Sequence, residues 1–313
     1  MNHLNLLLVG LGNMGKIHKR IIESNNNTNL FGVVDVSFQK KYEIKKGVKY
    51  YNNLNLVDFE NEHIDGVIIA STTNSHYKIG KNILDLKLPL FIEKPVSINK
   101  KELNSLLNNA KRQNLVFRGG LIEIYNPIFQ YIKELKLKDI ISIHIFRHSQ
   151  SVKNSRNLEN VLFDLALHDI SILGYLFNNP KLKLKGSNYS FKRKSMETAD
   201  LMFKYNKSNI FISTSRESQL KIRKWNIQTK NKLYHIDLIQ KNIDIYDSGS
   251  IKYPDANLLS LKSNHSTLSF ANQTETAQIQ LNEFIENIRK NKVDGKHLDL
   301  VKYSHNIVSD INN

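Results

Sequence analysis

The sequence predicts two domains: an α/β domain with a parallel sheet, followed by an α+β domain with an open antiparallel sheet. Strand and helix patterns alternate through about residue 120, as successive βαβ units do. After Pro127 most strand patterns follow one another without helical crossovers, which indicates antiparallel pairing. At 313 residues the chain is long enough for two cores. We expect a first domain over residues 1–120 and a second over 121–313, whose last helix can pack back on the first domain.

The first predicted strand is a near-continuous apolar run over residues 4–9, as a strand covered on both faces requires. It ends in a glycine-rich turn, Gly10-Leu11-Gly12-Asn13-Met14-Gly15. Gly10 permits the tight turn, Gly12 lets the backbone approach a pyrophosphate, and Gly15 allows the following helix to pack closely. That helix begins near Asn13 and points its N–H groups at the phosphates. The turn therefore predicts a dinucleotide site built from Gly10, Gly12, Asn13, Met14 and Gly15.

The second strand, Leu30 to Val34, ends at Asp35, about 20 residues beyond the glycine turn. A carboxylate at that place accepts the ribose hydroxyls of a dinucleotide, so strand, turn, helix, strand and acid together predict a Rossmann domain. Asp35 repels a 2′-phosphate and no arginine follows it directly, which favours NAD. NADP is the alternative, because Lys40 and Lys41 are close in sequence.

Four more strands complete the predicted parallel sheet: residues 47–51, 65–70, 88–92 and 115–117, with helices through Leu86 and over Lys100–Arg112. Loops at the carboxyl ends of such strands line the nucleotide crevice. Two of these loops are rich in polar residues. They add the following predicted cofactor-binding residues: Ser71, Thr72, Asn74, His76, Glu93 and Lys94.

The second domain is predicted to begin with a helix over residues 128–135 and an alternating strand over 141–146. A helix around Asp164 and His168 follows, then five strands: 183–191, 200–205, 209–215, 222–229 and 233–239. Helices over 279–288 and 298–311 end the chain. An exposed sheet with one apolar face usually needs a partner, so we expect a homo-oligomer, a dimer or tetramer, through this sheet.

Composition excludes several classes of site. The absence of cysteine rules out disulfides, thiolate zinc sites and a cysteine nucleophile, and it fits a cytoplasmic location. No metal site is predicted. No apolar run approaches the length of a membrane span, so no membrane association is expected. The net charge of +16 comes from lysines scattered among many asparagines, a distribution that does not indicate nucleic-acid binding. The charge can still attract a phosphorylated substrate.

Two short motifs carry chemistry. Asp164 and His168 are four residues apart, which on a helix puts an acid and an imidazole on one face, among apolar neighbours. Glu93-Lys94-Pro95 follows a strand at the edge where the cofactor is expected. A lysine beside a cationic nicotinamide should have a depressed pKa, which lets it polarise a hydroxyl and pass a proton. A structural His–Asp pair and a surface turn are the alternatives.

The order of these motifs resembles that of the Gfo/Idh/MocA family, the glucose–fructose oxidoreductase and inositol dehydrogenase type, over essentially the whole chain. The motifs are Gly10–Gly15 with His18, Glu93-Lys94-Pro95, and Asp164 to Asp169. The resemblance implies that Lys94 and His168 form the acid/base pair, that Asp164 assists, and that a cis peptide precedes Pro95. His18 is expected to make a structural hydrogen bond.

Within the family, four stretches look like the UDP-N-acetylglucosamine 3-dehydrogenase branch: residues 120–127, 163–170, 197–200, and 221–223 followed by 237–240. That branch has a histidine at the position of Leu121 and an arginine at the position of Ile124, so this chain departs from it there. The resemblance implies a sugar substrate, nucleotide-linked as a UDP-N-acetylhexosamine and oxidised at carbon 3.

The predicted reaction is hydride transfer between a secondary hydroxyl of the sugar and the nicotinamide. Candidate substrate-binding residues are Tyr125, Asn126, Arg156 and His168, with Lys153 near Arg156. Core packing for Tyr125, a pre-proline turn for Asn126 and solvated loop charges for Arg156 and Lys153 are the alternatives. Two other functions stay open: a free-sugar or inositol dehydrogenase of the same family, and a non-catalytic NAD-binding scaffold.

Overall fold

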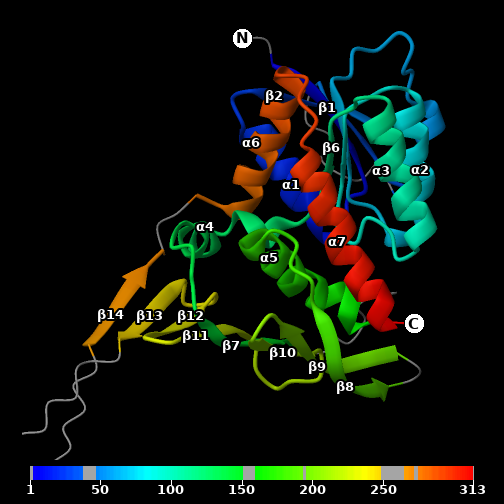
Figure 1. Ribbon diagram of the computed structural model, residues 1–313. Helices are drawn as coiled ribbons and strands as arrows, with labels where there is room; N and C mark the ends of the chain where they lie inside the picture. Colours follow the sequence, from blue (N-terminus) through cyan, green and yellow to red (C-terminus); the bar gives the residue numbers. More distant parts are fainter. Residues whose placement is uncertain are drawn as a thin grey trace, which may run out of the picture. The chain divides into compact units, whose positions relative to one another are not determined.

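The computed structural model describes residues 3–37, 47–150, 159–192, 195–247, 264–270 and 274–312. The chain divides into two compact units (Figure 1). The first unit comprises Met1–Tyr125 together with Thr274–Asn313, and the second comprises Asn126–Gln273. Residues 274–313 are grouped with the first unit, whereas the sequence-based prediction counted them in a second domain whose last helix can pack back on the first.

The first unit contains a six-stranded parallel sheet in the order β3-β2-β1-β4-β5-β6. Its strands are β1 (Leu4–Val9), β2 (Thr28–Val34), β3 (Lys49–Tyr51), β4 (Gly66–Ile69), β5 (Leu90–Ile92) and β6 (Phe117–Gly119). The connecting helices are α1 (Asn13–Ser24), α2 (Thr73–Asp85) and α3 (Lys100–Arg112), with short 3₁₀ turns η1 (Leu54–Leu56) and η2 (Ile122–Tyr125). The order reverses direction between β1 and β4, and a sheet of this kind binds its ligand at the carboxyl ends of those strands.

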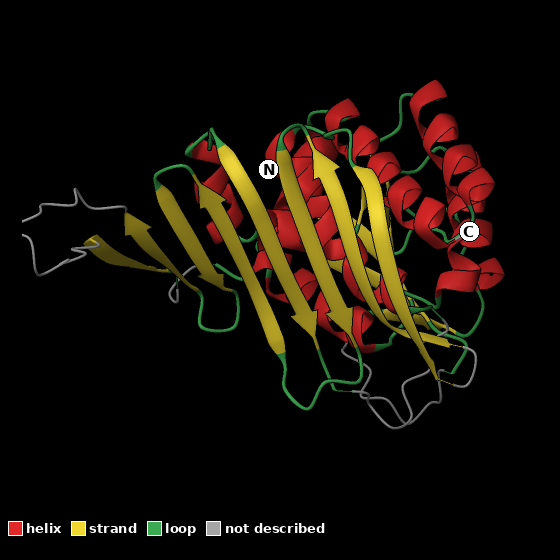
Figure 2. Cartoon of the chain, turned by 60° about the horizontal axis from the view of Figure 1, so that its bottom comes forward, coloured by secondary structure: helices red, strands yellow, loops and turns green. Residues whose placement is uncertain are grey.

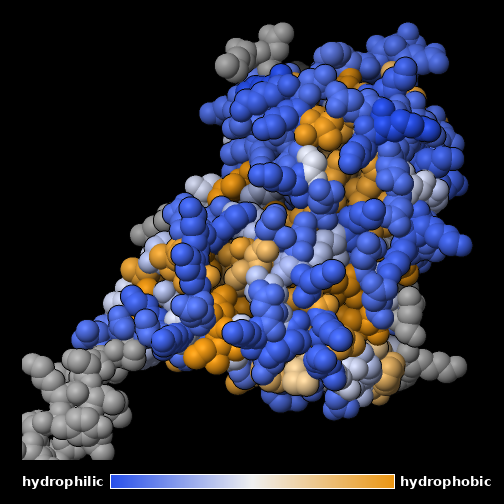
Figure 3. Space-filling view, in the orientation of Figure 1, coloured by the Kyte–Doolittle hydropathy of each residue, from blue (hydrophilic) through white to orange (hydrophobic). Residues whose placement is uncertain are grey.

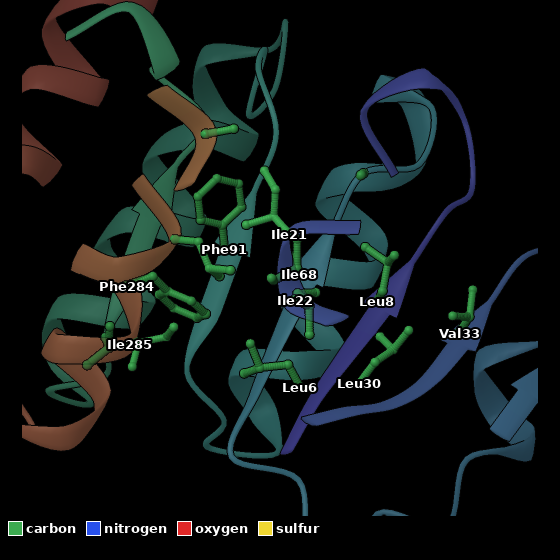
Figure 4. Close-up of a cluster of buried hydrophobic side chains, with 14 residues drawn as sticks. Leu6, Leu8, Ile21, Ile22, Leu30, Val33, Ile68, Phe91, Phe284 and Ile285 are labelled. Atoms are coloured by element: carbon green, nitrogen blue, oxygen red, sulfur yellow. The ribbon is translucent and has the colours of Figure 1, made fainter. Parts of the chain in front are cut away.

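Helix α6 (Thr276–Arg289) completes the core of this unit, although it is far from the sheet in sequence. Figure 4 shows Phe284 and Ile285 of α6 among side chains from the strands and from α1. The rings of Phe284 and Phe91 meet edge to face, with centroids 5.9 Å apart. Both are almost fully buried, and burial of a side chain of this size contributes roughly 1.5–3 kcal/mol. The apolar spacing of α6 is therefore explained by the sheet it covers.

Helix α7 (Gly295–Asn312) is attached to the same sheet by two buried histidines. His297 Nε2 accepts the backbone N–H of Gly119 at 3.0 Å, and His305 Nε2 accepts that of Val96 at 3.0 Å. Both rings must be neutral to accept these bonds. The helix also contacts α3. The C-terminal segment thus supports the loops that follow β5 and β6.

The second unit is built on an eight-stranded sheet in the order β14-β13-β12-β11-β7-β10-β9-β8. Its strands are β7 (Ile140–His148), β8 (Lys183–Lys192), β9 (Ser195–Tyr205), β10 (Ser208–Ser215), β11 (Ile222–Thr229), β12 (Lys232–Asp237), β13 (Asn242–Asp247) and β14 (Asn264–Ser269). All neighbouring pairs are antiparallel except β7 and β10, which are parallel because the helical segment and two strands lie between them in the chain. The expected antiparallel domain is therefore confirmed as a mostly antiparallel one.

The helices of this unit are α4 (Pro127–Glu134) and α5 (Leu167–Phe177), which follows a π-helical segment, η3 (Leu162–Ala166). Trp225 of β11 is fully buried, and its ring lies 5.1 Å from that of Phe129 of α4. Arg147 of β7 donates two hydrogen bonds, of 2.7 and 2.9 Å, to the buried carboxylate of Asp169 in α5. The Trp225 indole donates to the same carboxylate at 3.1 Å. These contacts join the helices to one face of the sheet.

The opposite face of the sheet carries a mixture of apolar and polar side chains, and Figure 2 turns it toward the viewer. In the described part of this unit, no helix covers it. Phe146 and Met202 are each 37% exposed. They line, with Phe211, a shallow hollow of about 390 Å³.

On the molecular face seen in Figure 3, hydrophilic residues cover most of the surface and hydrophobic ones gather in patches. Among the described residues, no helix combines the length and the apolar character that a membrane span needs.

Candidate active site

The glycine turn after β1 has the three-part geometry that its sequence predicts. Gly10 has φ +101°, and a Cβ there would lie 2.6 Å from backbone atoms of Ala70. A Cβ on Gly15 would lie 2.0 Å from the carbonyl oxygen of Gly10. At Gly12, by contrast, a Cβ would meet nothing within 4 Å. Internal packing therefore requires glycine at the first and third positions, and Gly12 borders open space where a pyrophosphate can approach the backbone.

Two helices that begin at this edge of the sheet, α1 and α2, have N-termini without a side-chain cap. Helix α1 starts with Asn13 and Met14, and α2 follows Thr72. The third connecting helix at this edge, α3, is capped, since the Asn99 side chain accepts N–H bonds from its first turn. Uncapped N–H groups at a helix N-terminus are suited to an anion. The ends of α1 and α2 thus fit the phosphates of a dinucleotide.

Asp35 stands at the carboxyl end of β2 and is tied to the glycine turn. Its Oδ2 accepts the backbone N–H of Leu11 at 2.6 Å, and its Oδ1 accepts the N–H and hydroxyl of Ser37. Burial alone would raise the pKa of this carboxyl, but the hydrogen bonds from Ser37 and Leu11 outweigh it and lower the pKa. Asp35 is therefore ionised at neutral pH, as a group that recognises ribose hydroxyls and repels a 2′-phosphate should be.

The loop after β4 is ordered by a buried histidine. His76 is 1% exposed, and its two ring nitrogens lie 2.9 Å from the carbonyl oxygen of Pro95 and 3.1 Å from that of Ser71. It therefore connects the loops after β4 and β5. Thr72 and Asn74 are exposed, whereas Ser71 is half-buried and bonded to Ser75 at 2.7 Å. Of these four predicted cofactor-binding residues, His76 lies inside the protein and the other three reach the surface.

The loop after β5 contains Glu93, Lys94 and Pro95. Glu93 is buried and its Oε1 lies 2.6 Å from His18 Nε2, while Oε2 accepts the Lys94 backbone N–H at 3.1 Å. The expected structural bond of His18 is thus present. The peptide before Pro95 is cis, as the resemblance implies. Over residues 90–97 every residue is buried except the half-buried Lys94. The loop therefore presents Lys94 at its surface and keeps Glu93 beneath it.

Asp164 and His168, like Lys94, are more exposed than the residues around them; they lie on the helical segment of the second unit. Over residues 161–174 these two are half-buried and all others are buried. The local geometry differs from the expected α-helix, because residues 162–166 form a π-helical turn. A π turn is wider than an α turn and occurs frequently at functional sites. The four-residue spacing thus brings an acid and an imidazole to the surface of an otherwise buried segment.

Arg216, directly after β10, is a residue that sequence reasoning missed. It is 7% exposed, and its Nη1 lies 3.5 Å from Oδ2 of Asp164. Nothing in its sequence neighbourhood distinguishes it from the other basic residues, since the contact joins residues that are far apart in the chain. Only the fold reveals it.

The remaining candidates differ in position. Tyr125 is 6% exposed and its hydroxyl accepts a bond from the buried Arg118, which favours the core-packing alternative. Asn126 caps α4 through its side chain, as a residue of a pre-proline turn can. Leu121 and Ile124, where the chain departs from its branch, are also buried. Lys40, Lys41, Lys153 and Arg156 lie outside the described residues.

Within the ranges that the structure describes, no group of histidine, aspartate and glutamate side chains could hold a metal ion. The groups that this edge of the sheet offers are backbone N–H groups, which donate hydrogen bonds, and the ionised carboxylate of Asp35, which accepts them. They fit a dinucleotide with a pyrophosphate and a ribose.

A family model described as an oxidoreductase family with an NAD-binding Rossmann fold, Gfo/Idh/MocA, matches residues 4–120. Among curated proteins, the UDP-N-acetylglucosamine 3-dehydrogenase of Acidithiobacillus ferrooxidans is 20% identical over 81% of this chain and 80% of its own length. The myo-inositol 2-dehydrogenase of Thermotoga maritima is 23% identical, and that match spans about half of each protein, 54% of this chain and 53% of the relative.

Solved structures show the same fold along nearly the whole chain. The crystal structure of the Acidithiobacillus ferrooxidans enzyme, GnnA, has a TM-score of 0.81 at 16% identity, covering 98% of this chain and 96% of that one. A point mutant of KijD10, a 3-ketoreductase from Actinomadura kijaniata in complex with TDP-benzene and NADP, has a TM-score of 0.84 at 10% identity, covering 99% and 97%.

Proposed function

Because residues 4–120 match the model of the Gfo/Idh/MocA oxidoreductase family, with its NAD-binding Rossmann fold, we propose that the chain is an oxidoreductase of this family and that it oxidises a secondary hydroxyl of a sugar. The hydride passes to the nicotinamide, or returns from it in the reverse direction. The observation that carries the proposal is the selective exposure of Lys94, Asp164 and His168. Each reaches the surface of a segment whose other residues are buried. Titratable groups presented in this way are candidates for acid/base work.

The chemistry assigns one role to each side chain. His168 takes the proton of the substrate hydroxyl as the C–H hydride leaves, which yields a ketone, a reduced nicotinamide and one proton. Asp164 orients the imidazole and stabilises the imidazolium that forms. Lys94 donates a hydrogen bond to the oxygen as it becomes a carbonyl. A positioned acid/base group of this kind contributes about 10²–10⁴-fold to a rate.

The residues proposed to hold the cofactor are those of the glycine turn and of the two polar loops. Backbone at Gly12 and the start of α1 would accept the pyrophosphate, and Asp35 would bind the ribose hydroxyls. The bound dinucleotide supplies a hydride acceptor. Because Asp35 is ionised and repels a 2′-phosphate, the proposed preference is NAD over NADP.

The proposed substrate is a UDP-linked N-acetylhexosamine oxidised at carbon 3. The support is the resemblance around residues 163–170 and 221–240, the names of the relatives, and a net charge of +16, which suits an anionic diphosphate. One observation favours a second candidate, a free-sugar or inositol dehydrogenase. Leu121 and Ile124 are buried and apolar where the branch has histidine and arginine, so they offer a substrate no polar side chain.

A screen of the purified protein distinguishes these substrates. The protein is incubated with NAD or NADP and with nucleotide sugars, free sugars or inositols, and products two hydrogens lighter are sought by mass spectrometry. We expect such a product from a UDP-N-acetylhexosamine, formed faster with NAD. A product from free sugars or inositols alone would establish the second candidate, and an NADP preference would refute the role of Asp35. No product from any substrate would favour a non-catalytic scaffold.

We further propose that the protein is a cytoplasmic homo-oligomer formed through the uncovered face of the large sheet, where Phe146 and Met202 are exposed. Replacing Phe146 with lysine should lower the molar mass measured by light scattering to that of a monomer. An unchanged mass would exclude this face.

A further inference from the structure

The Arg216 side chain is bonded to several groups near the helical segment of the second unit. Its Nε and Nη2 donate to the two carboxylate oxygens of Glu197 on β9, at 2.8 and 2.9 Å, in a bidentate pair. Nη1 donates to the backbone carbonyl of Glu159 at 2.9 Å, and Nη2 reaches the hydroxyl of Ser195 at 3.2 Å. The guanidinium is therefore fixed in place by groups from β9 and from the chain just before η3.

The remaining contact of this guanidinium is the carboxylate of Asp164, 3.5 Å from Nη1. The Arg216 side chain is 8% exposed, that of Glu197 14% and that of Asp164 23%. Two carboxylates thus share one buried positive charge. Such pairs interact more strongly than exposed ones, because the solvent screens them less.

On this geometry, and resting on the function proposed above, we propose that Arg216 is the positioning residue for Asp164. It holds the Asp164 carboxylate at the surface of the π turn. Glu197 compensates part of the guanidinium charge and so weakens its electrostatic effect on Asp164. The Glu159 carbonyl bond fixes the start of the same turn. Asp164 in turn sets the orientation and basicity of His168.

The sign of the effect follows from the charges around this segment. The elements packed against η3 are β10 and α5. Helix α4 packs against α5 in turn. In the part of the chain that the structure describes, the charged side chains of these elements and their neighbours include Arg216 with Glu197, the Arg147–Asp169 pair, and Lys133 of α4, whose Nζ lies 3.4 Å from the centroid of the Tyr175 ring of α5. Removing Arg216 lets more of the Asp164 charge act on His168 and raises the pKa of that imidazole. Removing the charge of Glu197 leaves more of the guanidinium field at Asp164 and lowers that pKa.

The test compares Arg216→Gln with Glu197→Gln in the full chain without substrate. The pKa of the His168 ring is measured by NMR on protein with labelled histidine, and its signal is assigned by its loss in His168→Gln. We expect Arg216→Gln to raise the His168 pKa by about 0.5–1 unit and Glu197→Gln to lower it by a similar amount. Arg216→Lys, which keeps the charge, should fall between the wild type and Arg216→Gln.

A matched control removes one positive charge elsewhere in the same unit. Lys224→Gln disrupts an ion pair of 3.3 Å with Asp237 and should leave the His168 pKa unchanged. If Arg216→Gln does not fold, Glu197→Gln and Arg216→Lys still decide the matter. Unchanged pKa values in the Arg216 and Glu197 variants, or shifts in the same direction for both, would overturn the proposal, since a purely structural role predicts no opposite shifts.

Activity supplies a second and separate readout. With a substrate from the screen, the pH–kcat profile reports the apparent pKa of the base. That pKa should be higher in Arg216→Gln and lower in Glu197→Gln than in the wild type. The NMR result needs no substrate. If the opposite shifts occur but no sugar is oxidised, the positioning of Asp164 stands and the proposed reaction fails.

Discussion

At the scale of single residues, the buried histidines of α7 make stability depend on pH. Burial lowers the pKa of His305 from 6.5 to about 4, because the charged ring would be desolvated. His305 is therefore protonated near pH 6.5 in the unfolded chain, but only near pH 4 in the folded protein. Stability is therefore full above pH 6.5 and decreases as the pH falls toward 4, by as much as about 3 kcal/mol.

Denaturant unfolding of the wild type and of His305→Gln at pH 7 and pH 5 measures this contribution. The variant should be less stable at pH 7 and should lose less stability between the two values. His63→Gln, at a side chain 81% exposed, serves as the control and should keep the wild-type slope. If the stability of His305→Gln changed with pH as much as that of the wild type, the His305 ring would not be neutral in the folded protein.

At the scale of an element, two substitutions in the glycine turn distinguish the glycine that packing requires from the glycine that cofactor binding requires. In Gly15→Ala the added methyl would overlap the carbonyl oxygen of Gly10, so the turn must distort and the free energy of unfolding should fall. In Gly12→Ala the methyl enters open space, so stability should change little. Affinity for NAD should nevertheless fall by about tenfold or more, because the methyl stands where the pyrophosphate approaches.

Thermal unfolding without cofactor and NAD titration by fluorescence give the two quantities. A Gly12→Ala protein that binds NAD as the wild type does would mean that the pyrophosphate lies elsewhere.

The elements also show where the sequence was informative. The parallel strands and the loops after β2, β4 and β5 were predictable, because buried runs ending in polar residues have a strong local pattern. Strand β14 was not, since five of its six residues, all but Leu268, are polar. The π turn and the Arg216–Asp164 contact were not predictable either. The contact joins segments far apart in the chain, which leaves no periodic signal.

At the scale of the whole molecule, the first unit is assembled from both ends of the chain. Buried Arg118 of β6 pairs with Glu283 and with Asp294, the latter at 2.7 Å, and both partners lie in the C-terminal segment. Without that segment the guanidinium would lose both carboxylates, and an unpaired buried charge costs about 3–5 kcal/mol. Phe91 would also lose Phe284.

We therefore expect residues 1–125 expressed alone to be unfolded, although they contain every strand of the parallel sheet. Residues 1–125 joined by a flexible linker to 274–313 should fold and bind NAD. Circular dichroism and NAD titration of the two proteins test this, and a folded 1–125 fragment would show that the C-terminal helices are dispensable.

The acid/base assignment is the central claim, and one comparison tests it most directly: NAD affinity and turnover of Lys94→Ala and His168→Ala on the substrate found in the screen. His63→Ala, which removes a histidine whose side chain is 81% exposed, is the control. Both site variants should bind NAD as the wild type does, while turnover falls by at least about 10²-fold. Near-normal turnover in either variant would contradict the account and make that residue structural.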